Sequence, residues 1–381
     1  MHHTVFETIF WVTVGILAYT YAAYPVLVFF FGLLFRRRRT VDPSYRPRVT
    51  LIIPAHNEAG CIEKKIKNAL DSDYPADRLE ILVASDASED ETVKIARRYE
   101  GRIRVLDYRE RRGKMGTVNR AVTEAQGDIL VLTDANAMYA GYTIKELVKH
   151  FADSSVGCVS GAKIIRNMDT DTTTGVGESG YWKYEAFLKY AEALSGSCVG
   201  ADGSVYAVRK EAYPFPPDQR IIMDDLAVSL LIVQKGYACV FEPSARAFEE
   251  SSKRIRQEFK RKIRIFAGAF SFFLQCPGAL LTRLFIKTVS HKILRWLTFA
   301  FQAVLFVCSF FLAADPLFRP VFGVQAVFYA CAAAGLFLNH YGVRILVFQI
   351  PYYFTMTTFA QIYGFWHYLR QGRTPAWEKL R

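Results

Sequence analysis

Polar and apolar positions between residues 49 and 132 alternate between short apolar runs and amphipathic stretches. Four runs have the length of strands, at 49–53, 79–84, 103–106 and 129–132. The run at 49–53 is expected to be buried, and the continuous β-branched run at 129–132 is expected to be buried on both faces. The first should end at Pro54, which lacks an N–H for the sheet. Helical spacing follows at 58–70 and at 114–123. Alternating strands and helices predict an α/β fold with a mostly parallel sheet and right-handed crossovers.

The last apolar run leads directly into an acidic turn, Asp134-Ala135-Asn136. In an open α/β sheet, ligands bind beyond the carboxyl ends of the strands. A carboxylate and an amide oxygen two residues apart can ligate a hard divalent ion that also holds a diphosphate. An ordinary Asp/Asn turn after a strand has the same residues, so this turn alone leaves both interpretations open.

A long apolar stretch at 6–35 contains no lysine or arginine, and Arg36–Arg39 follow it at once. Its length suits a membrane span. A signal peptide would carry its positive charge before the apolar core. The arginines therefore predict a span with its N-terminus outside and the following residues in the cytoplasm.

Three more stretches approach the length of a span, at 296–314, 321–338 and 345–366. His291 precedes the first of them at an expected interface, where a lone histidine is more often structural than catalytic. Four spans in total would place the basic tail 370–381 outside, against the positive-inside rule. Either one stretch is not a full span or the tail breaks the rule, and the sequence leaves both open.

Residues 251–273 form an amphipathic pattern that predicts a helix in the membrane interface. Attraction to anionic lipid explains most of its basic residues. These are Lys253, Arg254, Arg256, Lys260, Arg261, Lys262 and Arg264.

Composition separates classes of function. The 381 residues are 51% hydrophobic and carry a formal net charge of +12, which together favour a membrane protein with positive cytoplasmic loops over a nucleic-acid binder. The seven cysteines are scattered without a CxxC pair, so reduced thiols are expected. Neither GxGxxG nor GxxxxGK[ST] occurs, so any nucleotide must be held in another way.

Five short motifs occur in an order and spacing that resemble a known family. They are Ile-Pro-Ala-His-Asn-Glu at 53–58, Ala-Ser-Asp-Ala-Ser-Glu-Asp-Glu-Thr at 84–92, Gly113-Lys114, Thr-Asp-Ala-Asn at 133–136 and Met-Asp-Asp at 223–225. The chain resembles the inverting, membrane-embedded family 2 glycosyltransferases of the GT-A fold. Bacterial cellulose, hyaluronan and poly-N-acetylglucosamine synthases are similar by pattern.

The resemblance implies which residues bind the nucleotide-sugar donor. They are Pro54, His56, Glu58, Asp86, Lys114, Asp134 and Arg264. Glu58 and Asp86 would contact the nucleoside, while Lys114 and Arg264 would neutralise the diphosphate. Glu58 has an alternative role as a negative charge at a helix N-terminus.

The resemblance also implies a metal site at Asp134 and Asn136, where most relatives have Asp at both positions. Mg²⁺ or Mn²⁺ there would stabilise the charge that builds on the leaving diphosphate. Asp225 would be the general base that deprotonates the acceptor hydroxyl, with its pKa raised by burial or by Asp224. Alternatively, Asp224 and Asp225 cap a helix that begins near Leu226, and both roles can hold together.

The same family pattern includes 178–185 and the glycine-containing loop 200–204, which it places against the acceptor and the donor sugar. Asp202 and Gly203 are the acceptor candidates of that loop, with turn stabilisation as the alternative for Asp202. Arg261 and Ile265 occupy the Gln and Trp positions of the Gln-Arg-x-Arg-Trp motif of processive relatives. That Trp borders the acceptor sugar, so Ile265 keeps single addition open as an alternative.

These expectations define four regions: an N-terminal span and basic flank at 1–39, a cytosolic GT-A domain at 40–250, interface helices at 251–290 and a membrane region with a basic tail at 291–381. The expected activity is inverting transfer from a UDP-sugar to a β-linked exopolysaccharide or its lipid-linked precursor, at the cytoplasmic face of a bacterial inner membrane. The alternatives are single addition to a polyprenyl-linked acceptor, a non-catalytic membrane scaffold and a soluble sugar-nucleotide-binding module.

Overall fold

The structure is a computed structural model that describes residues 2–166, 173–217, 223–250, 255–343 and 345–371. Its described part contains an eight-stranded sheet of order β3-β2-β1-β4-β7-β6-β8-β5. The strands are β1 Val49–Ala55, β2 Leu79–Asp86, β3 Arg104–Tyr108, β4 Ile129–Leu132, β5 Met138–Tyr139, β6 Val156–Arg166, β7 Tyr206–Arg209 and β8 Ala238–Glu250. The first four are parallel neighbours, whereas β7 runs antiparallel to both β4 and β6. The predicted α/β class and mostly parallel sheet are confirmed.

The sheet is buried on both faces because its apolar residues alternate between two separate cores. Ile52, Leu130 and Leu132 belong to one core, and Ile129 and Val131 to the other. Helices α5 and α8 pack on the first face, and α3 and α6 pack on the second. Every residue of β4 is buried, as the continuous apolar run predicted.

The expectation that Pro54 ends the first strand is wrong. Strand β1 continues to Ala55, and Pro54 pairs with Ala84 of β2. The pairing of β1 with β4 stops at Ile52, so Pro54 lies where the strand is paired on one side only. A proline is tolerated there because it interrupts no hydrogen bond to a second neighbour.

The helices fall into two groups. Those of the α/β part are α3 Ile62–Leu70, α4 Thr92–Arg97, α5 Gly113–Glu124, α6 Thr143–Val148, α7 Thr173–Leu194 and α8 Asp224–Gln234. The others are α1 His2–Ala18, α2 Tyr24–Leu34, α9 Ile255–Gln275, α10 Phe285–Thr288, α11 Leu294–Trp296, α12 Thr298–Phe311, α13 Phe318–His340 and α14 Leu346–Gln371. The π-helical turns η1 (Tyr19–Ala23) and η6 (Val289–Ile293) join α1 to α2 and α10 to α11.

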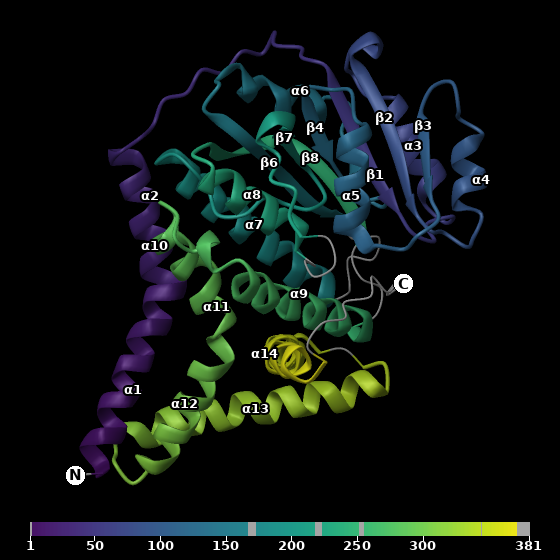
Figure 1. Cartoon of the computed structure of the whole chain (residues 1–381). Coiled ribbons are helices and arrows are strands. Elements are labelled where there is room, and N and C mark those ends of the chain that lie inside the picture. The colour runs from purple at the N-terminus through teal and green to yellow at the C-terminus, as the bar shows by residue number, and fades with distance from the viewer. Residues whose placement is uncertain (1, 167–172, 218–222, 251–254, 344, 372–381) are drawn as a thin grey trace.

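The α/β part lies to one side of a group of helices formed by the two ends of the chain (Figure 1). Within the described residues, two helical stretches are long and apolar enough to cross a membrane, His3–Leu34 and Phe318–His340. A third span results if Phe285–Trp296 and Thr298–Phe311, bent by 58°, count as one. The predicted spans at 6–35 and 321–338 thus coincide with continuous helical stretches, and the one at 296–314 with part of the bent pair.

The expectation of a further full span at 345–366 is not supported. Helix α14 covers it but contains Pro351 and several polar residues, among them Gln349 and Gln361. Its Gly364 packs against α9, where an added Cβ would lie 2.9 Å from the Ile263 carbonyl oxygen. Helix α9 itself lies between the sheet and α14, as Figure 1 shows. Residues 251–254 of the predicted interface helix and 372–381 of the tail lie outside the described residues.

Candidate active site

The ends of β1, β2 and β4 place the predicted donor-binding residues at one edge of the sheet. His56 follows β1, Asp86 ends β2, and Asp134 follows β4 by two residues. His56 Nδ1 lies 2.7 Å from the Asp86 carbonyl oxygen, which joins the first two strand ends. Parallel strands bring their carboxyl ends together, as the sequence predicted.

Asp86 is wholly buried, and its carboxylate already has two backbone partners. The Arg112 N–H donates to Oδ1 at 2.8 Å, and the Gly113 N–H donates to Oδ2 at 2.9 Å. Gly113 has φ of +75°, a conformation that glycine adopts without strain. The carboxylate therefore fixes the start of α5 and with it the next residue, Lys114. Contact of Asp86 with a nucleoside stays a prediction.

Glu58 lies in the turn before α3. Its backbone N–H donates to Thr92 Oγ1 at 2.7 Å, and its Oε2 accepts from Cys61 Sγ at 3.0 Å. Asp90 accepts from the Thr92 N–H at 3.0 Å and from the Ala59 N–H at 3.1 Å, so it ties the turns after β1 and β2 together. These contacts fix the two turns relative to each other. The nucleoside contact of Glu58 stays a prediction.

Lys114 is the charged centre of the site. Its Nζ lies 2.8 Å from Asp134 Oδ1 and 3.1 Å from Asp224 Oδ2. Burial alone would lower the pKa of Lys114, but the two carboxylates outweigh burial and raise it above its ordinary value. Burial likewise opposes ionisation of Asp134, yet Lys114 leaves the pKa of that carboxyl below its ordinary value. Residues from the turn after β4, from α5 and from α8 thus share one charge network.

The two aspartates at the start of α8 differ in their environments. Asp225 Oδ1 accepts from the Leu226 N–H at 2.8 Å, and Oδ2 accepts from the Gly203 N–H at 3.0 Å. Burial and the neighbouring Asp224 charge raise the pKa of Asp225 to about 6. A half-buried carboxylate with that pKa is suited to accept a proton near neutral pH. Helix α8 begins at Asp224, after Met223 at the N-cap, and this cap makes no side-chain hydrogen bond, so the alternative of a capping pair for a helix that begins near Leu226 is not supported.

The loop before β7 faces Asp225. Asp202 is buried, and its Oδ1 accepts from the Ser204 N–H at 3.1 Å and from the Ser204 hydroxyl at 2.7 Å. These bonds support turn stabilisation for Asp202, and its contact with a sugar stays a prediction. Gly203 bonds to Asp225 as described. The stretch 178–185, by contrast, lies in helix α7 and not in a loop.

Helix α9 contributes the basic side of the site. Arg264 feels the charges of Asp134 and Asp224, and burial lowers its pKa despite them. Its Nε is buried with no hydrogen-bond partner in the described residues, so the guanidinium is available to bind an anion. Arg261 instead pairs with Glu258 Oε2 of its own helix at 2.8 Å. Ile265 is half-buried on the same helix.

Asp134 and Asn136 fit a divalent cation in part. Both are half-exposed while Ala135 and Ala137 are buried, so both oxygen-bearing side chains are accessible to a ligand. Such hard oxygen ligands suit Mg²⁺ or Mn²⁺. The described residues contain no group of three or more His, Cys, Asp and Glu side chains that could hold a metal. Diphosphate oxygens would have to complete the coordination.

Lys65 is a site residue that sequence reasoning missed. It is fully buried on α3, and its Nζ donates to Thr133 Oγ1 at 2.9 Å and to the Ala137 carbonyl oxygen. Burial lowers the pKa of Lys65 to about 7. The ammonium thus braces both ends of the turn that carries Asp134. The sequence feature that could have indicated a buried lysine is its position three residues after Ile62, on the apolar face of the helix.

Comparisons with known proteins show which sequences and which solved fold this chain resembles. Residues 50–214 match the family described as Glycosyl transferase family 2. The chain contains a family 2 glycosyltransferase domain. This chain is 25% identical over 234 residues to the poly-β-1,6-N-acetyl-D-glucosamine synthase of Staphylococcus aureus, and the match covers 60% of this chain and 56% of the synthase. The matched region thus spans little more than half the length of that relative.

Two further proteins are similar. The glycosyltransferase AglD of Haloferax volcanii is 33% identical over 133 residues, 33% of this chain and 21% of AglD. The solved mannosyltransferase PcManGT of Pyrobaculum calidifontis, in complex with GDP-Man and Mn²⁺, superposes with a TM-score of 0.70 and is 25% identical. That likeness covers 96% of this chain and 99% of the mannosyltransferase, so it includes the helices at both ends. The predicted GT-A fold is confirmed.

Proposed function

We propose that this glycosyltransferase moves a sugar from a nucleoside diphosphate donor to an acceptor hydroxyl at a membrane surface, with inversion. The observation that carries the proposal is the meeting of Lys114, Asp134, Asp224 and Asp225 at the carboxyl edge of the sheet. It supplies a cation for the leaving group beside a carboxylate whose pKa is about 6.

In the proposed reaction, Asp225 accepts the proton of the acceptor hydroxyl as its oxygen attacks the anomeric carbon. The bond to the diphosphate breaks in the same displacement, which inverts the configuration. Lys114 and Arg264 neutralise the diphosphate as it leaves. A divalent cation held by Asp134 and Asn136 would add Lewis-acid stabilisation of the same charge.

The donor and the acceptor are the finer part of the proposal. A β-linked polysaccharide product is supported by the similarity to the staphylococcal synthase, whereas the UDP-sugar donor and the lipid-linked precursor rest on the resemblance of the motifs. GDP-mannose is the alternative donor, because the likeness to the mannosyltransferase extends over nearly the whole of both chains. Single addition to a polyprenyl-linked acceptor is the second candidate function, favoured by Ile265 at the Trp position of the processive motif.

The membrane arrangement follows from charge. With Arg36–Arg39 in the cytoplasm, the catalytic part at 40–250 and the interface helices at 251–290 are cytoplasmic too. If the bent pair is one span, the described residues contain three candidate spans and α14 lies on that same side. We propose this topology for a bacterial inner membrane, because it puts the basic tail on the side that the charge rule favours.

The test is nucleotide release by the detergent-purified chain with UDP-N-acetylglucosamine, UDP-glucose or GDP-mannose, each with Mn²⁺, with Mg²⁺ and with EDTA. We expect one donor to turn over with a cation, and Asp225→Asn to abolish that turnover. Asp77→Asn, which changes an exposed aspartate with 81% side-chain exposure, is the matched control and should be active. A sizing gel separates a polymer from a single addition. No turnover with any donor, or full turnover by Asp225→Asn, would contradict the proposal.

A further inference from the structure

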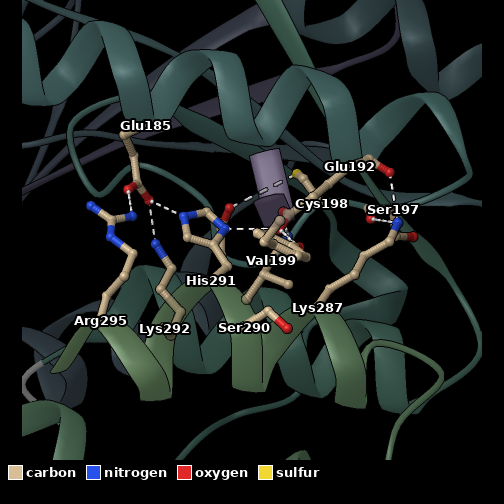
Figure 2. Close-up of polar contacts among 12 residues, drawn as sticks. Glu185, Glu192, Ser197, Cys198, Val199, Lys287, Ser290, His291, Lys292 and Arg295 are labelled. Atoms are coloured by element: carbon tan, nitrogen blue, oxygen red, sulfur yellow. Dashed lines mark hydrogen bonds and ion pairs between the residues drawn. The ribbon is translucent and has the colours of Figure 1, made fainter. Parts of the chain in front are cut away.

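A buried ionic cluster lies between α7 and the α10–η6–α11 segment, and the proposed mechanism does not use it (Figure 2). His291 Nδ1 lies 2.9 Å from Glu192 Oε1, and its Nε2 lies 3.1 Å from Glu185 Oε1. Arg295 Nη1 lies 2.9 Å from Glu185 Oε2, and Lys292 also pairs with Glu185. His291 and Glu192 have no exposed surface, so the cluster is part of the interior.

Glu192 differs from Glu185 because its partners lie outside the cluster as well as inside it. The Tyr24 hydroxyl of helix α2 donates to Glu192 Oε1 at 2.6 Å. The Val199 N–H donates to Glu192 Oε2 at 2.8 Å. Burial raises the pKa of Glu192, but the donors from His291, Tyr24 and Val199 outweigh it and leave the pKa below its ordinary value. The carboxylate thus joins a candidate membrane helix to a loop of the α/β part.

That loop leads from Val199 to the proposed general base. Gly200 has φ of +81°, Asp202 N–H donates to Ser160 Oγ at 3.1 Å, and Gly203 N–H donates to Asp225 Oδ2 at 3.0 Å. Only three residues separate the amide held by Glu192 from the amide that holds Asp225. The loop is therefore held by Glu192 at Val199, by Ser160 at Asp202 and by Asp225 at Gly203.

Other side chains hold the start of the same loop. Lys287 Nζ donates to the Glu192 carbonyl oxygen at 2.7 Å and to the Ser197 carbonyl oxygen at 2.9 Å. Arg39 Nη2 donates to the Gly196 carbonyl oxygen at 2.6 Å. These bonds fix the end of α7, whereas the Glu192 side chain reaches past them to Val199.

The two π-helical turns meet at this place. The Tyr19 hydroxyl of η1 lies 2.8 Å from Ser290 Oγ of η6, and His291 is the next residue of η6. π-Helical turns are rare and occur frequently at functional sites. Both segments that approach the membrane therefore send a donor to Glu192, Tyr24 from one and His291 from the other.

We propose that Glu192 is a positioning residue for the transfer reaction, which holds loop 199–203 so that Gly203 keeps its hydrogen bond to Asp225. The proposal rests on the proposed role of Asp225. It makes the placement of the base depend on the two membrane-facing segments that fix Glu192. A displacement of about 1 Å at a reacting group can cost about 100-fold in rate, so loss of this support should lower kcat.

The test compares Glu192→Gln with the full-length wild type in detergent. A glutamine keeps the shape but offers one acceptor oxygen in place of the two that receive Val199, Tyr24 and His291. We expect kcat to fall about 10- to 100-fold, while the donor KM and the nucleotide Kd change less than about twofold. With the nucleotide bound to both proteins, hydrogen exchange of peptides covering 197–204 should be faster in Glu192→Gln than in the wild type.

The matched control is Glu242→Gln. Glu242 is likewise buried, lies 2.8 Å from a histidine (His150 Nε2) and accepts from a backbone N–H (Ser244, 2.9 Å), but it has no bond to the loop. It should leave kcat and the exchange of 197–204 unchanged. Wild-type kcat in Glu192→Gln, or equal losses of kcat and donor affinity in both variants, would overturn the proposal.

Tyr24→Phe is the second variant if Glu192→Gln does not fold. It removes one hydroxyl donor, and we expect kcat to fall about two- to fivefold with donor KM unchanged; wild-type kcat would again overturn the proposal. The proposed function is tested separately, because full turnover by Asp225→Asn refutes the base. Hydrogen exchange of residues 197–204 measures the mobility of loop 199–203 in Glu192→Gln and in Tyr24→Phe alike.

Discussion

Replacement of Lys114 by methionine should show how the charges of the site are balanced. The substitution keeps an unbranched side chain and removes the ammonium that contacts Asp134 and Asp224 at 2.8 and 3.1 Å. Because both oxygens lie about 3 Å from one nitrogen, they are at most about 6 Å apart, close enough to repel strongly once the cation is lost.

The magnitude follows from burial. Removal of one partner of a buried ion pair costs about 3–5 kcal/mol, and the lower end applies because the Asp134 side chain is 34% exposed. We therefore expect the free energy of unfolding to fall by about 3 kcal/mol without metal. Turnover should fall about 10²- to 10³-fold, the typical cost of one charge-stabilising group.

The assay is a thermal melt of the detergent-purified protein across a Mn²⁺ titration without donor. In Lys114→Met, the cation takes the place of the ammonium, so Mn²⁺ should raise the apparent melting temperature more than in wild type. Arg120→Met, which removes a cation of the same helix that stacks 3.9 Å from the Tyr108 ring centroid, is the matched control. Equal Mn²⁺ responses in wild type and Lys114→Met, or retained turnover, would refute the reasoning.

Three more predictions test separate parts of the structure. The acidic limb of the kcat profile should fall off below pH of about 6, because Asp225 must be ionised to accept a proton and its pKa is about 6; a limb near pH 4 would contradict this. Lys65→Met should lower the affinity for Mn²⁺ about tenfold, because Thr133, at the start of the turn that carries Asp134, loses its hydrogen-bond donor. An unchanged Mn²⁺ titration of activity would contradict this prediction. Gly32→Val should lower the free energy of unfolding by about 1–3 kcal/mol, because its Cβ would lie 2.7 Å from the carbonyl oxygen of residue 191 of α7. A Cβ at Gly15 would meet nothing within 4 Å, so Gly15→Val is the control in the same thermal melt.

Local patterns were sufficient for the strands and for the residues at their ends. The run 129–132 is buried on both faces as predicted, because a strand between two helical layers must be apolar at every position. Asp86 and Asp134 lie at the same edge of the sheet because parallel strands end at one edge, and that follows from the alternation of strands and helices. The motifs also identified Lys114 and Asp225, whose contacts and pKa suit the proposed roles.

Membrane spans were predicted less well, because length and apolar content do not include bends or packing. The stretch at 345–366 forms a helix that packs on α9, and the one at 296–314 belongs to a pair of helices bent by 58°. Pro54 continues its strand because the pairing with β4 has already ended, which depends on the register between strands.

The sequence by itself determined the α/β fold, the presence of apolar spans and the residue types of the site, because each rests on periodicity or on a short motif. Only the tertiary structure decided which polar side chains meet: Lys114 with Asp224, 110 positions away, and Glu192 with Tyr24, 168 positions away. Such pairs depend on strand order and on helix packing across the sheet. A buried lysine or glutamate has the same letter as an exposed one, so its partner becomes known only when the chain has folded around it.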